Sequence, residues 1–182
     1  SLCRLTRLKT LYVNHNKLSK LPLLIGHLKQ LEILQFKNNQ LCTLPNSLGK
    51  LQQLEQLDLQ ANKLNSLPQS IGGLSKLSKF DLSKNKLTNI PVSFGQLSNL
   101  TSLYLHNNRV LKIKRIFGDL SKLRVWYVDR KSFQNIPANL LNLELAELCI
   151  VSPSLDFPMN LITGRKNIKI YLHFLQVVMA LY

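Results

Sequence analysis

A repeat of 23 residues constrains this chain more than any other feature of its sequence. Three kinds of residue recur in step with one another at this spacing. They are the asparagines Asn16, Asn39, Asn62, Asn85 and Asn108, the prolines Pro22, Pro45, Pro68 and Pro91, and the glycines Gly26, Gly49, Gly72, Gly95 and Gly118. A period of this length indicates a repeat architecture, in which each unit buries its apolar face against its neighbours.

The unit that begins at residue 51 reads LQQLEQLDLQANKLNSLPQSIGG. Leu57 and Leu59 alternate with polar residues, which predicts a short strand with one buried face. Asn62 follows the strand. We expect its side chain to bond backbone groups of its own turn and of the next coil, which explains the strict spacing.

The second half of the unit returns the chain to the next strand. Leu64 and Leu67 are expected to point inward. Pro68 and Gly72 are expected to bracket about one helical turn, with the proline just inside its start and the glycine just past its end.

The pattern LxxLxLxxNxLxxLPxxIGxL resembles the 23-residue class of leucine-rich repeats over residues 2–143. This class is common in bacterial proteins and in intracellular signalling scaffolds. The resemblance implies an α/β fold: a curved right-handed solenoid with a concave parallel sheet of about seven or eight short strands, and short helical turns or loops on the convex side. We expect one domain over residues 1–182, with regular repeats in 1–143 and degenerate repeats and a C-terminal cap in 144–182.

The repeat departs from its pattern at both ends. Leu2 occupies the slot of Ile25 and no polar cap precedes it, so we expect upstream sequence to be missing. Lys114 replaces the proline of the fifth repeat, and Lys131 replaces the asparagine of the sixth, which predicts that the asparagine series ends at Asn108. Trp126 occupies a leucine core slot.

After Pro137 the register loosens, because Pro158 follows 21 residues later. We expect a degenerate seventh strand near residues 148–151, an eighth near residues 169–174, and a turn between them at Gly164. The apolar stretch IKIYLHFLQVVMALY (168–182) is interpreted as a cap over the core. A truncated continuation and a membrane-interface segment are alternatives, although 15 residues are too few to span a bilayer.

The net charge of +15 suggests an anionic partner, unless it reflects a compositional bias. One basic series follows the asparagines along an edge: Lys17, Gln40, Lys63, Lys86 and Arg109. It favours nucleic acid, lipid headgroups or an acidic protein, or else protects an exposed edge from aggregation. The stripe lacks the interleaved aromatic residues that single-stranded nucleic-acid binding uses, so nucleic acid is the weaker interpretation.

The side chains that alternate with the buried leucines face the concave side and form columns across the strands. The central column is predicted to hold Tyr12, Gln35, Asp58, Asp81, Tyr104 and Tyr127. From these columns we predict a partner-binding surface, since tyrosine and arginine are enriched at binding hot spots. Its residues are Tyr12, Ile33, Gln35, Asp58, Lys79, Asp81, Tyr104, His106, Tyr127, Asp129 and Arg130.

Residue patterns of known catalytic chemistry are missing from the sequence. The four histidines show no metal-ligand spacing, and there is neither a nucleophile elbow nor a phosphate-binding loop. Asp58 and Asp81 lie one strand apart on an open face, which favours a binding surface over an acid–base pair. The three cysteines do not cluster, which favours a reducing compartment. We therefore expect a non-enzymatic chain without catalytic residues, metal or cofactor.

The expected function is a protein-interaction module, and its partner binds on the concave face. Bacterial members of the class include secreted effectors that bind host proteins, so a host protein is one expected partner, and such an effector would be secreted into the host cell. The alternatives are a docking module for anionic membrane or nucleic acid and the substrate-recognition fragment of a larger enzyme. A monomer is expected.

Overall fold

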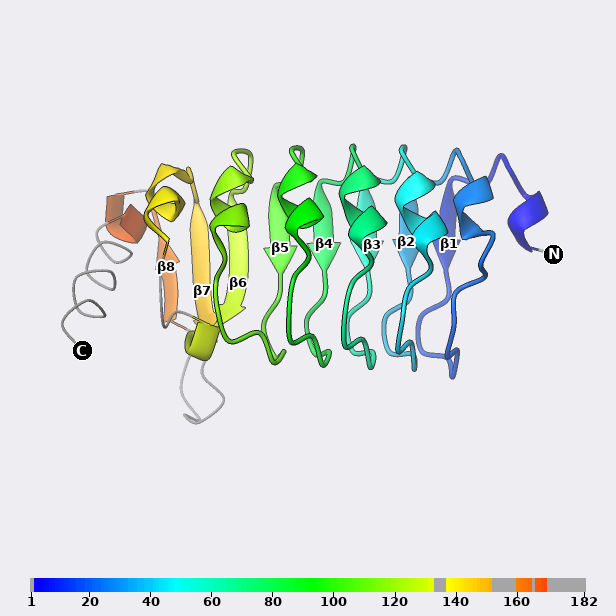
Figure 1. The fold of residues 1–182 in the computed structure, drawn as a ribbon, viewed down its shortest axis with the longest axis horizontal. Helices are drawn as coiled ribbons and strands as arrows, with labels where there is room; N and C mark the ends of the chain where they lie inside the picture. Colours follow the sequence, from blue (N-terminus) through cyan, green and yellow to red (C-terminus); the bar gives the residue numbers. More distant parts are fainter. Residues whose placement is uncertain (1, 133–136, 152–159, 165, 170–182) are drawn as a thin grey trace.

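The computed structural model describes residues 2–132, 137–151, 160–164 and 166–169. One sheet of eight strands runs the length of the molecule in chain order. The strands are β1 (Thr10–Tyr12), β2 (Ile33–Gln35), β3 (Gln56–Asp58), β4 (Lys79–Asp81), β5 (Ser102–Tyr104), β6 (Val125–Asp129), β7 (Glu147–Val151) and β8 (Asn160–Thr163). Strands β1 to β7 pair in parallel. Figure 1 shows them side by side from the N-terminal to the C-terminal end.

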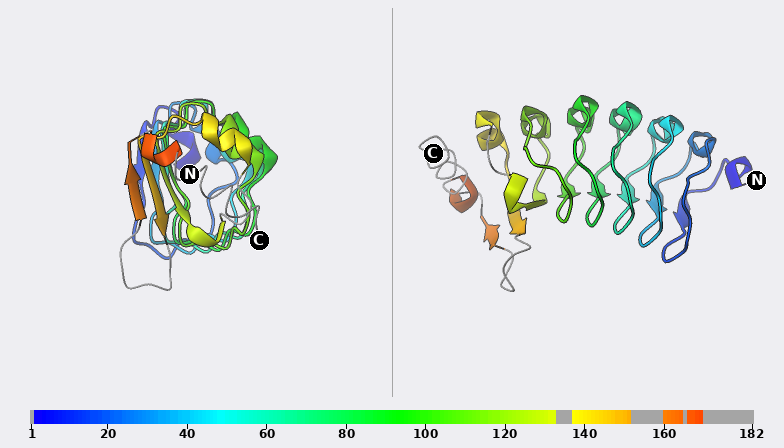
Figure 2. Two further views of the ribbon diagram at one scale, coloured as in Figure 1. Left: turned by 90° about the vertical axis from the view of Figure 1, so that its left-hand side faces the viewer. Right: turned by 60° about the horizontal axis from the view of Figure 1, so that its bottom comes forward.

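Short 3₁₀ helices stack along the opposite side of the solenoid. They are η1 (Leu2–Arg4), η2 (Ile25–His27), η3 (Asn46–Lys50), η4 (Gln69–Gly73), η5 (Val92–Gln96), η6 (Arg115–Asp119) and η8 (Ala138–Asn142). A further helix, η7 (Arg130–Ser132), directly follows β6 and lies apart from this row (Figure 1). Figure 2 shows the helices along the outer side of an arc whose inner side carries the strands. The predicted solenoid with a concave sheet is therefore confirmed.

The core lies between the sheet and the 3₁₀ helices. The middle residue of each of the strands β1 to β5 points toward it, as does Trp126 in β6, and Leu57, Phe80 and Trp126 are almost completely buried. Phe94 and Phe117 extend the core on the convex side, where the Phe117 ring stacks on Trp126 with centroids 5.3 Å apart. Each coil alone leaves these side chains in water, so burial arises from stacking between neighbours.

The asparagine series forms the predicted backbone bonds, but toward the other neighbour. Asn62 donates through Nδ2 to the carbonyl of Leu59 in its own turn (3.1 Å) and to that of Phe36 (2.8 Å). Its Oδ1 accepts from the amide of Leu41 (2.9 Å). Phe36 and Leu41 belong to the preceding coil, so the prediction that Asn62 bonds the next coil is wrong. The Asn62 side chain lies against the preceding coil, whose Phe36 carbonyl and Leu41 amide it pairs.

The predicted roles of proline and glycine in the convex turn are also corrected. Pro68 has extended backbone (φ −70°, ψ 150°) and precedes η4, whereas Gly72 lies inside this helix. A Cβ on Gly72 would lie 2.4 Å from the Ser93 carbonyl oxygen of the next coil. Glycine is therefore required at this position because the stacked convex turns approach closely, and not because it ends a helix.

The C-terminal end of the sheet departs from the repeat. The seventh strand is confirmed at Glu147–Val151. The strand predicted near residues 169–174 lies outside the described residues apart from residue 169, which is helical. The eighth strand of the sheet, β8, lies earlier in the chain and pairs antiparallel with β7. A parallel partner needs a crossover of about a dozen residues or more, and the segment 152–159 is too short for one. Gly164 does mark a turn, with φ +84°, but after β8. The apolar residues 170–182 lie outside the described residues.

Candidate functional site

The parallel register places the central column as predicted. Tyr12 pairs with Gln35, Gln35 with Asp58, and so on through Asp81, Tyr104 and Tyr127. Because the strands pair in register, side chains at equivalent positions lie on the same concave face, and neighbouring ones are separated by the strand spacing of about 4.8 Å. The concave face therefore presents one continuous row of polar and aromatic side chains.

At the N-terminal end of this row, Tyr12 is the most exposed member, with 59% of its surface accessible. Gln35 accepts a hydrogen bond from Asn14 Nδ2 (2.9 Å). Ile33 is half-buried, and the Glu32 beside it forms a salt bridge with Lys9 (2.8 Å). This end is thus internally paired, apart from the ring of Tyr12.

An aromatic cluster of Tyr104, His106 and Tyr127 lies toward the C-terminal end. The ring centroids of Tyr104 and Tyr127 are 5.0 Å apart, and those of His106 and Tyr127 are 5.8 Å apart. All three side chains are only half-buried. Aromatic pairs at such separations stabilise one another beyond simple burial, so the cluster presents a preformed surface.

The polar groups of the aromatic cluster have shifted acidities. The Tyr127 hydroxyl donates a hydrogen bond to a carboxylate oxygen of Glu147, and this bond raises the pKa of Tyr127. Burial raises the pKa of Tyr104, and the nearby Glu147 adds to this effect. Burial lowers the pKa of His106, whose Nδ1 has no hydrogen-bond partner among the described residues. At neutral pH the two hydroxyls are thus protonated donors, and His106 is a neutral imidazole with an unused polar nitrogen.

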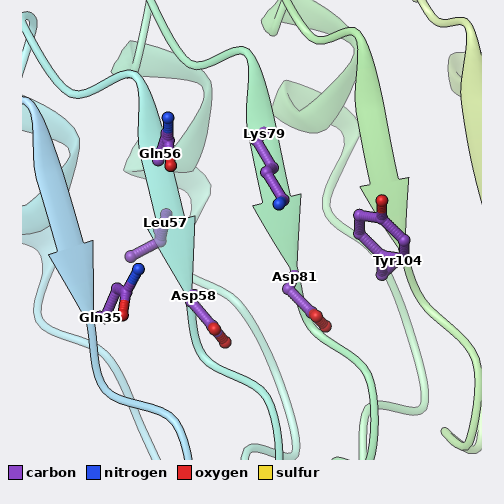
Figure 3. A pocket seen from close by; sticks show the side chains of 7 residues that line it. All are labelled: Gln35, Gln56, Leu57, Asp58, Lys79, Asp81 and Tyr104. Carbon is purple, nitrogen blue, oxygen red and sulfur yellow. The ribbon is translucent and has the colours of Figure 1, made fainter. Parts of the chain in front are cut away.

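A pocket lies beside the aromatic cluster, on strands β2 to β5. Its lining consists of Gln35, Gln56, Leu57, Asp58, Lys79, Asp81 and Tyr104. Figure 3 shows the carboxylates of Asp58 and Asp81 on neighbouring strands, with the ring of Tyr104 on the next strand. We call it the Asp58–Tyr104 pocket. Five of the predicted partner-binding residues therefore meet here: Gln35, Asp58, Lys79, Asp81 and Tyr104.

Two predicted surface residues lie elsewhere. Asp129 was expected on the concave face, but it is buried, and its carboxylate accepts from the amides of Asn107 (2.8 Å) and Asn108 (2.9 Å). One coil earlier, the amide of Lys84 bonds a backbone carbonyl, that of His106. The prediction for Asp129 is wrong because its side chain takes the place of that carbonyl. Arg130 is exposed, but it begins η7 after the strand.

Glu147 belongs to the surface and was missed. Val125 pairs with Glu147, and Tyr127 with Cys149, which is an offset of 22 residues instead of 23. The 23-residue spacing therefore could not reveal Glu147. The tertiary pairing also buries Cys149, which raises the pKa of its thiol to about 11.

The basic series occupies the edge where it was expected. Lys17, Lys63, Lys86 and Arg109 are exposed, and Gln40 is half-buried. Lys63 donates to the Gln40 side chain (3.0 Å). Within the described residues, no group of three or more histidine, cysteine or carboxylate side chains is arranged to hold a metal ion. None of the helices in the described ranges has both the length and the apolar composition of a membrane-spanning segment.

Known structures share this architecture. A leucine-rich-repeat protein of Leptospira interrogans is 27% identical, with a TM-score of 0.57, over 85% of this chain and 46% of its own. The plant peptide hormone receptor RGFR1, solved in complex with RGF2, is 29% identical, with a TM-score of 0.72, over 80% of this chain and 24% of its own. The leucine-rich repeat domain of the type III effector XopL is 24% identical, with a TM-score of 0.69, over 79% of this chain and 52% of its own. This chain thus spans about half the length of these structures or less.

Sequence families give the same assignment, although no curated protein matches the chain. The family described as a leucine-rich repeat region matches residues 48–158, and a second, described as a leucine rich repeat, matches residues 6–64. The first match alone covers more than half of the chain. Together with the 23-residue period and the stacked parallel coils, these matches show that the chain belongs to the leucine-rich repeat family.

Proposed function

We propose that this chain is a protein-binding module whose partner contacts the concave face at the aromatic cluster and the Asp58–Tyr104 pocket. The observation that supports it most directly is the half-exposed aromatic cluster of Tyr104, His106 and Tyr127 beside a lined pocket. Apolar rings with polar tips are the residues that contribute most to binding at protein interfaces.

The geometry favours a binding role because the surface is rigid and chemically mixed. The ring centroids of Tyr104 and Tyr127 lie 5.0 Å apart, and the Tyr127 hydroxyl donates a hydrogen bond to Glu147. A partner that docks here orders few additional side chains, so less of the interaction free energy is lost to conformational entropy. The strands below are held by the asparagine bonds and the buried leucines.

The test is affinity capture with the full chain as bait, comparing the wild type with the double variant Tyr104→Ala and Tyr127→Ala. We expect the double variant to retain at least about tenfold less partner, because truncation of an interface hot spot costs about 2 kcal/mol or more. Retained proteins are quantified by mass spectrometry, and thermal unfolding checks that both baits are folded.

The matched control is the double variant Leu23→Ala and Val92→Ala. These residues are exposed near or on the convex helices, at 79% and 67%. Capture by the control should equal that of the wild type. Equal loss in both double variants, or no loss in the tyrosine variant, would contradict a concave binding site.

A narrower form of the proposal is the recognition part of a bacterial effector that acts on a host protein. Capture from a eukaryotic lysate and from a bacterial lysate, run in parallel, tests it. A partner retained only from the eukaryotic lysate, and lost in the tyrosine variant, is the expected result for an effector. A partner retained only from the bacterial lysate contradicts that role and leaves the concave site standing.

A further inference from the structure

The Asp58–Tyr104 pocket holds two carboxylates that form no salt bridge within the described part of the chain. Asp58 Oδ1 accepts from the backbone amide of Gln60 (2.9 Å), and Asp81 Oδ1 accepts from the amide (2.8 Å) and the hydroxyl (2.7 Å) of Ser83. Neither forms a salt bridge with a described residue; the salt bridges resolved there are Lys9–Glu32 and Lys169–Glu144. In each carboxylate, Oδ1 thus accepts hydrogen bonds from the residue two positions later, and Oδ2 is available to a ligand.

The two carboxylates lie close together in a half-buried position. Asp58 and Asp81 are register partners on neighbouring parallel strands, with about 4.8 Å between the strands. Burial raises the pKa of Asp58, and the charge of Asp81 adds to this effect, although the Gln60 amide and the lysines Lys37 and Lys79 act in the opposite direction. A ligand with a delocalised positive charge would relieve the repulsion between the two carboxylates.

The aromatic wall of the pocket already faces a cation. Lys79 Nζ lies 5.9 Å from the centroid of the Tyr104 ring, within the range of a cation–π contact. The Tyr104 ring also packs against Tyr127, with centroids 5.0 Å apart, which restricts its orientation. Gln35 and Gln56 complete the lining with amide groups that accept hydrogen bonds.

We propose that this pocket binds the guanidinium group of an arginine side chain presented by a protein partner. The planar group donates to Asp58 and Asp81 together, and its face takes the place of the Lys79 ammonium against the Tyr104 ring. Arginine fits better than lysine because its rigid planar fork presents several donors toward two carboxylates while its flat face stacks on an aromatic ring, whereas an ammonium group is a compact point charge without a planar face. This assignment rests on the proposed concave binding site and names the chemistry of its ligand.

The test uses Nα-acetyl-arginine amide as the probe and NMR chemical shifts of the full chain as the readout. We expect saturable shifts of the Tyr104 ring signals in the wild type that weaken as sodium chloride is raised, because salt screens the partly exposed carboxylates. The double variant Asp58→Asn and Asp81→Asn should bind at least about tenfold more weakly. Asparagine keeps the oxygen that accepts from Gln60 and Ser83, so the sheet is retained.

The control is Asp119→Asn, which neutralises one carboxylate at an exposed residue on the convex helix η6, away from the pocket. It should bind the probe as the wild type does. Nα-acetyl-lysine amide should bind several-fold more weakly than the arginine probe. No saturable shift with arginine, an equal shift in the Asp58→Asn and Asp81→Asn variant, or equal binding of both probes would overturn the proposal.

The two proposals fail separately. If the tyrosine variant loses its captured partner while the arginine probe does not bind, only the arginine assignment is wrong. If the probe binds the pocket while capture is unchanged by the tyrosine variant, only the concave partner site is wrong.

Discussion

At the scale of single residues, the asparagines join one coil to the next. Asn85 is buried and donates to the carbonyls of Leu82 (3.0 Å) and Leu59 (2.9 Å), while it accepts from the amide of Leu64 (3.0 Å). No other side-chain type of this size has both two donors and an acceptor in a neutral group. The bonds therefore satisfy backbone groups that the turn would otherwise bury without partners.

Replacing Asn85 by alanine is expected to lower the free energy of unfolding by about 2–4 kcal/mol, because buried backbone groups of two coils lose their partners. Urea denaturation measures the change. Asn16→Ala is the matched control, since Asn16 is exposed and, among the described residues, donates to Val13 and Asn14 of its own coil and not to another coil. Its loss should be about 1 kcal/mol or less. Equal losses would show that the bonds between coils add nothing.

At the scale of elements, the spacing of the convex helices depends on glycine. A Cβ on Gly49 in η3 would lie 1.9 Å from the carbonyl oxygen of Ser70 in η4, which real atoms do not tolerate. At Gly95 in η5 the nearest atom, the Ile116 carbonyl oxygen, is 3.3 Å away. The same residue in the same slot thus meets a strict steric limit in one coil and a mild one in another.

Gly49→Ala is expected to destabilise the protein by about 1–3 kcal/mol, since η3 and η4 must move apart and disturb the packing below them. Gly95→Ala should change stability by no more than about 1 kcal/mol, because loss of unfolded-state entropy offsets a small displacement. The comparison is made by thermal unfolding of both variants. A larger loss at Gly95 than at Gly49 would refute the steric explanation.

At the scale of the whole molecule, charge is unevenly distributed. The chain carries a net charge of +15, yet Glu32, Glu55, Asp58 and Asp81 lie on or beside the concave strands. The basic edge of Lys17, Lys63, Lys86 and Arg109 runs along a different side. Because the coils stack at short intervals, the positive charges of the basic edge repel one another. The carboxylates in the middle of the concave face instead favour a cationic ligand.

Raising sodium chloride from about 20 to about 300 mM is expected to increase Tm by about 2–4 °C, because added salt screens the repulsion among the excess cations. Differential scanning calorimetry measures the change. The double variant Lys63→Gln and Lys86→Gln removes two exposed charges of the edge and should show a smaller increase. A Tm that falls with salt, or the same increase in both proteins, would rule out this account.

Much of the fold and part of the site could be predicted from the sequence. In a solenoid each coil contacts its neighbours, so two residues that are 23 apart in the sequence lie side by side in neighbouring coils. This explains why the central column from Tyr12 to Tyr127 and the meeting of Tyr104 with Tyr127 were predicted correctly. It also explains the buried Trp126 and the end of the asparagine series at Asn108, beyond which Lys131 donates to the Asn108 carbonyl instead.

The sequence by itself determined the period, the solenoid and the register of β1 to β6. In a strict repeat, residues that are one period apart in the sequence occupy equivalent positions and environments in neighbouring coils. Only the tertiary structure decided the antiparallel pairing of β8, the burial of Asp129 and the arrival of Glu147 beside Tyr127. These features arise where the spacing changes. There, the position of a side chain depends on which backbone group of the adjacent coil lacks a partner, and such a group is defined only once the coils are stacked.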